Sequence, residues 1–222
     1  MKGVRVTEYH RWAAAGSLAK LTELGLLLQT DANLPNVCAF VAGAPVRGSW
    51  WAHPRSHEIF RVNCELAEHP DVLVTKLISH KITYVHRTLW PAVVAIGRAR
   101  ESWQLERLSR DARKLLDEVD RKPVPTDRRL SKPASELEIN LLVYSEQFHT
   151  AAGSHARRLE SWDHWARRTG YIGDIGERTA VVRAKLTLED VVASLNGTFG
   201  GSGRLPWQNE VIADRRGAPG RQ

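Results

Sequence analysis

The sequence predicts a mainly α protein with β-hairpins (α+β), organised as two tandem winged-helix-like units with a helical connection. Three observations favour this class. Apolar residues recur at three-to-four spacing over most of the chain, as they do on the buried faces of amphipathic helices. Two β-rich stretches, around residues 72–85 and 146–160, are each divided by a short polar turn. A tryptophan, Trp90 or Trp162, follows each stretch and is expected to open a further helix.

The first helix is expected over residues 7–29, with an apolar face formed by Trp12, Ala15, Leu18, Leu21 and Leu24. Gly25 is expected to end this helix, because glycine adopts the left-handed conformation of a C-cap at little cost. The three leucines that follow, residues 26–28, predict a short buried segment that emerges into a polar turn. A second short helix is expected from residue 35 to about residue 43.

The central stretch, residues 46–91, predicts a helix followed by a two-stranded ribbon. Pro54 suits the first turn of a helix, because its missing N–H would have no partner there. Apolar residues follow at helical spacing until the break at His69-Pro70, and residues 79–81 form a polar connection suited to a hairpin. Large aromatic residues flank this ribbon and the second one, and we expect structural roles for Trp50, Trp51, Trp90 and Trp162.

A helical connection is expected to follow the first ribbon. Trp90-Pro91 predicts the start of one helix, and a longer amphipathic helix is expected from Trp103 to Val119. Residues 121–135 hold three prolines and five basic residues, a composition typical of a linker. We therefore expect a first winged-helix-like domain with a helical extension at residues 1–121, a second at residues 122–212 and a disordered tail at residues 213–222.

The second unit is expected to repeat the order of the first. Ser135 suits the N-cap of a helix, and the second ribbon and a helix from Trp162 to Arg168 come after it. A last helix is expected over residues 176–197, with Asn196-Gly197 as its end. Three apolar residues beyond it are expected to pack back, namely Phe199, Leu205 and Trp207. The match between the two ribbons is short, so it is compatible with a true repeat and with chance.

The composition favours nucleic acid as a partner, ahead of an acidic membrane surface, because the formal net charge is +7 and the pI is about 9.7. No apolar run approaches the roughly 20 residues of a membrane helix, and the first residues lack the apolar core of a signal peptide, so we expect a cytoplasmic protein. Neither cysteine belongs to a C-x-x-C pair. No metal or cofactor is expected, since His53 and His57 have no clear third ligand and the P-loop and G-x-S-x-G motifs are absent.

Basic and imidazole side chains lie on both ribbons, where the wing of a winged helix meets DNA. We expect DNA contacts from Lys76, Lys81, His86 and Arg87 on the first ribbon and from His155, Arg157 and Arg158 on the second. In the alternative interpretation, these side chains form solvated faces of ribbons that pack through their apolar sides. Tyr84 and the turn histidines favour the DNA interpretation, because they are able to stack on or bond to nucleotides.

Three segments of the first half resemble the bacterial winged-helix DNA glycosylases of the AlkZ and YcaQ type. LGLLLQTDAN is similar to their LG-x-x-Q-hydrophobic-D-x-x-N segment, RGSWWAHPRSHEIF resembles their GWW-x-W-x-P-S-x-x-x-L-x-x-L signature, and YVHRTLWP is similar to their ribbon ending R-x-Y-D-L-x-x-x-x-x-P. The resemblance covers about residues 20–95. The chain departs from the family at Thr30, which replaces the hydrophobic residue, and by one extra residue between the glycine and the glutamine. It is also much shorter than those enzymes, which carry three winged-helix units and a β-barrel.

This resemblance implies base excision, with Asp31 stabilising an oxocarbenium-like sugar or activating water and Gln29 positioning that water. One placed carboxylate suffices, because an alkylated base is already cationic and needs little acid catalysis to leave. Alternatively, both residues cap the turn before Pro35. Three functions therefore stay open: excision of alkylated or crosslinked bases from double-stranded DNA, DNA binding without catalysis, and a structural or protein-interaction role. The sequence does not predict the oligomeric state.

Overall fold

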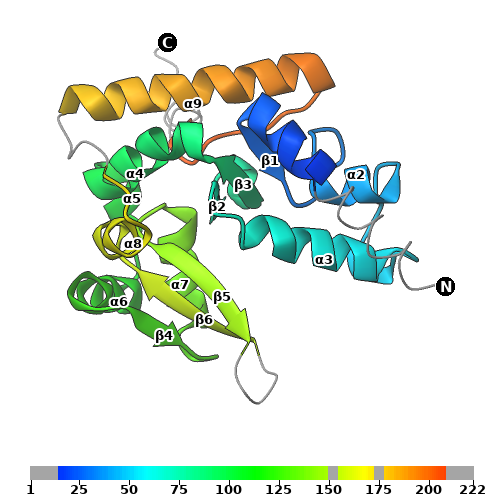
Figure 1. The fold of residues 1–222 in the computed structure, drawn as a ribbon. Coiled ribbons are helices and arrows are strands. Elements are labelled where there is room, and N and C mark those ends of the chain that lie inside the picture. Colours follow the sequence, from blue (N-terminus) through cyan, green and yellow to red (C-terminus); the bar gives the residue numbers. More distant parts are fainter. Residues whose placement is uncertain (1–14, 150–154, 173–177, 209–222) are drawn as a thin grey trace, which may run out of the picture. The chain divides into compact units, whose positions relative to one another are not determined.

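The computed structural model describes residues 15–149, 155–172 and 178–208. The chain is a mixed α+β protein with two small antiparallel sheets of three strands each (Figure 1). It divides into two compact units: unit 1 comprises Met1–Trp90 with Thr187–Gly203, and unit 2 comprises Pro91–Leu186 with Arg204–Gln222. The boundary expected from the sequence, at 121/122, differs from this division. No helix in the described part of the chain is both long enough and apolar enough to cross a membrane.

Unit 1 begins with a helix over residues 15–24, and its other elements follow in the order β1 (Leu26–Leu28), α2 (Val37–Ala42), η1 (Trp50–Ala52), α3 (Ser56–Ala67), β2 (Val72–Lys76), η2 (Ile78–His80), β3 (Ile82–His86) and η3 (Arg87–Leu89). Gly25 ends the first helix as expected, since it has a φ of 75° and its N–H bonds the carbonyl of Leu21. The part of the expected helix before residue 15 lies outside the described residues.

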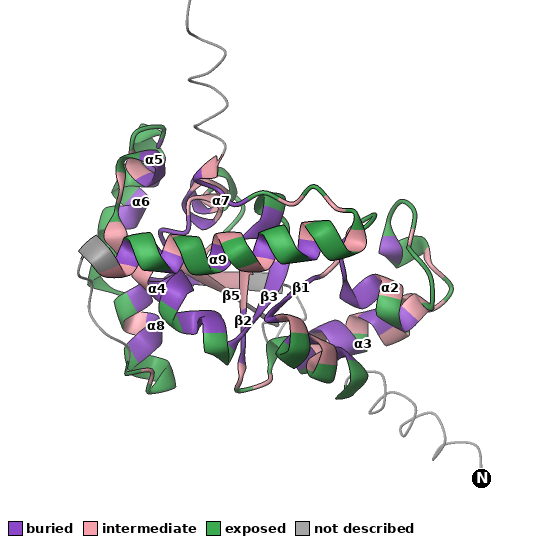
Figure 2. Cartoon of the chain, turned by 90° about the horizontal axis from the view of Figure 1, so that it is seen from above, coloured by how far each residue is buried: buried purple, intermediate pink, exposed green. Residues whose placement is uncertain are grey.

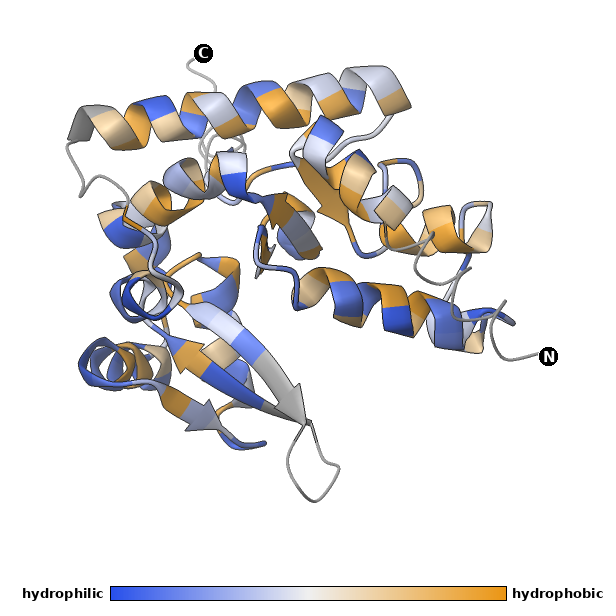
Figure 3. Ribbon diagram, viewed as in Figure 1, coloured by the Kyte–Doolittle hydropathy of each residue, from blue (hydrophilic) through white to orange (hydrophobic). Residues whose placement is uncertain are grey.

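The sheet of unit 1 has the strand order β1-β3-β2, so the expected two-stranded ribbon has a third strand. Leu27 of β1 and Val74 of β2 are the opposite neighbours of Tyr84 in β3. The strands are largely buried (Figure 2), and along α3 apolar and polar residues alternate (Figure 3). The inward face of α3 packs against the sheet to form the core, which also contains Leu21, Val37, Val41, Trp50, Ile59, Val62 and Leu66.

Helix α4 (Trp90–Ala99) belongs to unit 2 from Pro91 onward. The other elements of unit 2 are α5 (Ser102–Leu105), α6 (Arg110–Arg121), β4 (Val124–Thr126), α7 (Ser131–Ile139), β5 (Tyr144–His149), β6 (His155–Glu160) and α8 (Trp162–Thr169). Its sheet has the order β4-β6-β5, which matches the order of the first sheet. The expected helix from Trp103 to Val119 is wrong in one respect, because the chain leaves the helix after Leu105. Ser109 then caps α6, and its Oγ accepts the N–H of Ala112 at 3.2 Å.

The proline-rich stretch expected to be a linker contributes β4 and the start of α7 to unit 2. Pro125 lies within β4 and faces Arg158 of β6. Proline is tolerated here because β4 is an edge strand, where one missing N–H leaves the ladder to β6 intact. The stretch is therefore folded into the second sheet.

Helix α4 approaches the indole of Trp162 closely at Gly97. A Cβ atom at this position would lie 2.2 Å from Trp162 Nε1, well inside van der Waals contact. That indole N–H donates to the carbonyl of Leu141 at 2.7 Å, and Trp162 is fully buried. Trp90 likewise donates its N–H to a backbone carbonyl, that of Val85 at 3.1 Å, and it too follows the last strand of its sheet. Both indoles are therefore buried in the fold, as is Trp50, whereas Trp51 is 60% exposed.

Helix α9 (Arg178–Phe199) extends beyond the expected end at Asn196-Gly197, and the division between the two units falls within it. It stops before Gly200, which has a φ of 67°. The amide of Asn196 instead makes two hydrogen bonds to the backbone of Gly203, at 2.7 and 2.9 Å. In unit 2, Leu205 and Trp207 are buried as expected, and the ring of Trp207 lies 5.8 Å from that of Trp103. The expected tail at 213–222 is outside the described residues.

Candidate functional site

Asp31 lies in the turn between β1 and α2, and both of its carboxylate oxygens are engaged. Oδ1 accepts the backbone N–H groups of Asn33 and Leu34, each at 2.9 Å, and Oδ2 accepts the ammonium of Lys81 at 2.7 Å. Burial raises the pKa of Asp31, but the hydrogen bonds from Lys81 and the two backbone N–H groups outweigh it, so the pKa lies below its ordinary value. These contacts are those of a residue that closes a turn.

The side chain of Gln29 has other hydrogen-bond partners than that of Asp31. Its side chain hydrogen-bonds the hydroxyl of Tyr84, which donates to Asn63 Oδ1 at 2.6 Å. Burial raises the pKa of Tyr84, which is 2% exposed. The chain bends at Gln29 and Thr30, directly after β1 ends, so the extended geometry that would place Gln29 and Asp31 on one side is not present. Gln29 therefore joins a buried polar network, whereas Asp31 closes the turn.

Replacing Asp31 tests whether its role is structural. Asp31→Asn keeps an Oδ1 acceptor but removes the ion pair with Lys81, so we expect a loss of at most about 1 kcal/mol at pH 7. Asp31→Ala removes all three hydrogen bonds and should cost about 1–3 kcal/mol. Urea denaturation followed by far-UV circular dichroism measures both.

The pH dependence supplies a second measurement. The folded-state pKa of Asp31 is lowered, so the carboxylate stabilises the protein above its unfolded pKa and loses this effect as the pH falls through the folded value. The difference in stability between wild type and Asp31→Asn should thus be constant above about pH 5 and shrink at lower pH. A difference that does not change with pH would contradict this role.

Most of the basic residues expected to contact DNA are held by carboxylates of the chain itself. Their ion pairs are Lys81–Asp31 at 2.7 Å, Arg87–Asp71 at 2.8 Å, Arg157–Glu138 at 2.8 Å and Arg158–Glu146 at 2.5 Å. Arg158 also lies 3.2 Å from the buried Glu160. Such pairs lower the local positive charge, so a phosphate would have to compete with an internal partner at each of them.

The other three candidates differ from these. His86 is 8% exposed, and its Nδ1 lies 3.0 Å from the hydroxyl of Thr88, so burial keeps it from contacting DNA in this conformation. Lys76 is half-buried at the end of β2. His155 belongs to β6, opposite His149, instead of lying in the turn between the strands, and its side chain is outside the description.

Several basic residues that the sequence analysis did not name as DNA contacts are exposed. Within the described residues they make no ion pair and no side-chain hydrogen bond. In unit 1 they are Arg47 and Arg61. In unit 2 they are Arg107, Arg110, Lys114, Arg121, Lys122, Arg128, Arg129 and Lys132. Their density around β4, in the stretch 121–132, is the signal in the sequence that could have identified them. It was interpreted as a feature of a linker instead.

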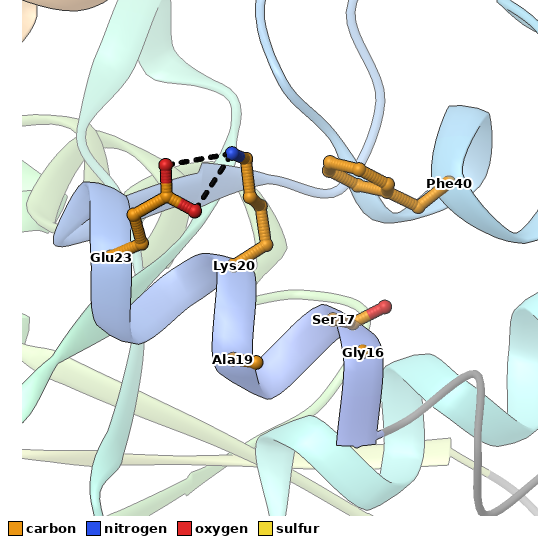
Figure 4. A pocket seen from close by; sticks show the side chains of 6 residues that line it. All are labelled: Gly16, Ser17, Ala19, Lys20, Glu23 and Phe40. Carbon is orange, nitrogen blue, oxygen red and sulfur yellow. Dashed lines mark hydrogen bonds and ion pairs between the residues drawn. The ribbon is translucent and has the colours of Figure 1, made fainter.

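A hollow in unit 1 has a volume of about 420 Å³ and is lined by Gly16, Ser17, Ala19, Lys20, Glu23 and Phe40 (Figure 4). Lys20 and Glu23 form an ion pair there at 2.8 Å, and Phe40 extends from α2 on the opposite side. A second hollow, lined by Asp111, Lys114 and Arg129 among others, lies in unit 2. Neither hollow includes Gln29 or Asp31.

The described residues contain no group of three or more His, Cys, Asp or Glu side chains placed to hold a metal ion. Both cysteines in the described part are free thiols, and burial raises the pKa of Cys38 to about 11. A thiol with so high a pKa is a poor nucleophile at neutral pH. No protein-family model, curated protein or solved structure matches the chain.

Proposed function

We propose that the chain binds DNA through winged-helix units and does so without excising bases. The observation that carries this proposal is the order of elements in unit 1, which is helix, strand, helix, helix, strand, strand, with the strands arranged as β1-β3-β2. In a winged helix, the helix before the hairpin enters the major groove and the hairpin forms the wing. In unit 1 these elements are α3 and the β2–β3 hairpin. This step rests on analogy between folds.

The geometry around Asp31 supports binding in preference to base excision. A carboxylate that stabilises a cationic sugar must be open to the substrate. Both oxygens of Asp31 are already bonded, one of them to the ammonium of Lys81, which would oppose a second positive charge. Gln29, the residue implied to position water, is bonded to the buried Tyr84. Excision of alkylated or crosslinked bases stays an alternative that the same experiments address.

The positive charge available to phosphates supports a particular set of contacts. Exposed cations without an internal partner offer their full charge, whereas those in ion pairs are partly neutralised. Arg128 and Arg129 are of the first kind, and Lys81 and Arg87 are of the second. We therefore place the strongest DNA contacts of unit 2 at the segment between β4 and α7.

Fluorescence anisotropy with a labelled 30-base-pair duplex tests this proposal. The affinity of the purified full chain should fall steeply as salt rises from 50 to 200 mM, because bound counterions are released from the DNA. Arg128→Gln/Arg129→Gln should reduce the slope of log K against log salt by about 1.8, since each lost phosphate contact lowers it by about 0.9. The matched control, Lys81→Gln/Arg87→Gln, removes the same charge and should change the slope by less than half as much.

Two outcomes would overturn the proposal. Absence of duplex binding by the wild type at 50 mM salt would exclude DNA binding and leave the structural or protein-interaction role. Release of a free base from alkylated or crosslinked DNA, lost in Asp31→Asn at unchanged stability, would instead establish the enzyme. Equal effects of the two double variants on the slope would place the contacts on the ribbon of unit 1 as much as on the β4–α7 segment.

A further inference from the structure

Trp51 is the most conspicuous exposed aromatic residue of unit 1. It is 60% exposed, while its neighbour Trp50 is 9% exposed and belongs to the core. The two indoles are stacked, with ring centroids 3.9 Å apart and an angle of 26° between their planes. The ring of Phe60 in α3 also lies beside Trp51, with ring centroids 5.6 Å apart. One face of the Trp51 indole is thus held by the protein, and much of the remaining surface is open to solvent.

The backbone around Trp51 is well held. It lies in the turn η1, where the N–H of Ala52 bonds the carbonyl of Ser49 and the N–H of His53 bonds that of Trp50, both at 3.1 Å. Helix α3 begins four residues after the end of this turn, and its inward face forms part of the core. The Trp51 ring is therefore preorganised, and a ligand that stacks on it would lose little affinity to ordering of the protein.

Positive charge lies close to this ring in the sequence and on α3. Arg61 follows Phe60 directly and lies one helical turn after His57, and both are exposed. Arg47 precedes Trp51 by four residues. Neither arginine has an internal partner within the described residues, whereas Arg55, on the same stretch, is bonded to Glu58 at 2.5 Å. Two acidic residues of α3 lie about one turn from Arg61: Glu58, which is paired with Arg55, and Glu65, which is exposed.

A flat exposed apolar face, with exposed arginines a few residues away in the sequence and on α3, matches the chemistry of a nucleotide, which joins a planar base to a phosphate. Paired bases inside a duplex are stacked on each other and cannot offer a face to the protein. Stacking on Trp51 therefore requires a base that is unpaired, in a single strand, at an end or turned out of the helix. We infer that Trp51, backed by Trp50 and Phe60, is a stacking platform for an unpaired nucleobase, with Arg61 and Arg47 contacting the adjoining phosphates.

This inference rests on the proposed DNA binding and names the state of the DNA that unit 1 recognises. The experiment compares three labelled DNAs in anisotropy titrations with the full chain: a 12-nucleotide oligothymidine, the same strand with abasic sites at its central positions, and a duplex. The abasic strand carries the same phosphates, so electrostatic attraction cancels in the comparison with oligothymidine. The wild type should bind oligothymidine about tenfold more tightly than the abasic strand.

Trp51→Ala should abolish this preference, lowering oligothymidine affinity about tenfold while changing abasic and duplex affinity less than twofold. Trp51→Phe should restore part of it, because phenylalanine keeps a flat face. Phe40→Ala is the matched control, since Phe40 is also an exposed aromatic of unit 1, and it should leave all three affinities unchanged.

Other results of the same titrations would contradict the inference. A wild type that binds the abasic strand as tightly as oligothymidine, or a Trp51→Ala variant that retains the preference, overturns the stacking platform while DNA binding itself stands. A wild type that binds none of the three DNAs overturns both.

Discussion

Gly97→Ala should destabilise unit 2 by about 3 kcal/mol, because overfilling a packed core and displacing a buried hydrogen bond act at the same place. The new Cβ would lie within 2.5 Å of three atoms of the Trp162 ring. The indole cannot move away without giving up its hydrogen bond to the carbonyl of Leu141. For a chain of this size, differential scanning calorimetry should record a melting temperature lower by about 6–12 °C.

Gly197→Ala provides the matched control for this prediction. Gly197 also lies within a helix, α9, but a Cβ there would meet no atom within 4 Å. Alanine favours the helical conformation, so this variant should be more stable than the wild type by about 0.5–1 kcal/mol. Equal and small effects of the two substitutions would mean that α4 does not pack against Trp162 as described.

Arg157→Met should destabilise the protein by about 3 kcal/mol, because it removes an ion-pair partner of a buried carboxylate. The side chain of Glu138 in α7 is 6% exposed and accepts from Arg157 in β6 at 2.8 Å. Methionine keeps an unbranched apolar stem in place of the aliphatic part of arginine, so the loss reports the guanidinium group more than the packing of the stem. Urea denaturation at pH 7 measures the change in the free energy of unfolding.

Two further variants separate burial from charge. Arg87→Met removes the same functional group from an exposed pair, in which Arg87 is 63% and Asp71 34% exposed, and should cost less than about 1 kcal/mol. The double variant Arg157→Met/Glu138→Leu removes both charges and should recover most of the lost stability. If Arg157→Met cost no more than Arg87→Met, the Arg157–Glu138 pair would not be buried as the structure has it. The result also matters for DNA binding, since a loss of affinity in Arg157→Met would partly report unfolding.

The spacing of apolar residues predicts a helix or strand correctly where prolines or polar turns in the sequence also mark its ends. Helix α3 and the β2–β3 hairpin follow from the apolar spacing after Pro54, the break at His69-Pro70 and the polar turn at 79–81. The sequence did not predict β1 as a strand. Its three successive leucines show no alternation of apolar and polar residues, and they resemble the end of a helix. Strand β4 escaped because two of the three prolines of its stretch flank or enter it, and only its edge position makes them acceptable.

The candidate site was less predictable, because its contacts join residues far apart in the chain. The turn position of Asp31 was one of the two interpretations that the sequence left open. Its pairing with Lys81, 50 residues away, depends on the sheet that brings β3 beside β1. The pairing of Arg157 with Glu138 likewise depends on where α7 lies on β6. Basic residues identify a partner class from composition alone, but which of them are free to bind it is decided by tertiary structure.

Unit 1 is formed by two segments that are far apart in the sequence, Met1–Trp90 and Thr187–Gly203. This division determines when unit 1 can finish folding during synthesis. Gly201 and Gly203 leave no room for a Cβ beside Leu34, so the segment after α9 closes over the loop that follows β1. A ribosome makes that segment only after all of residues 91–186. Nascent unit 1 therefore keeps Leu34 uncovered while residues 91–186 of unit 2 emerge, and a segment made late in synthesis covers it.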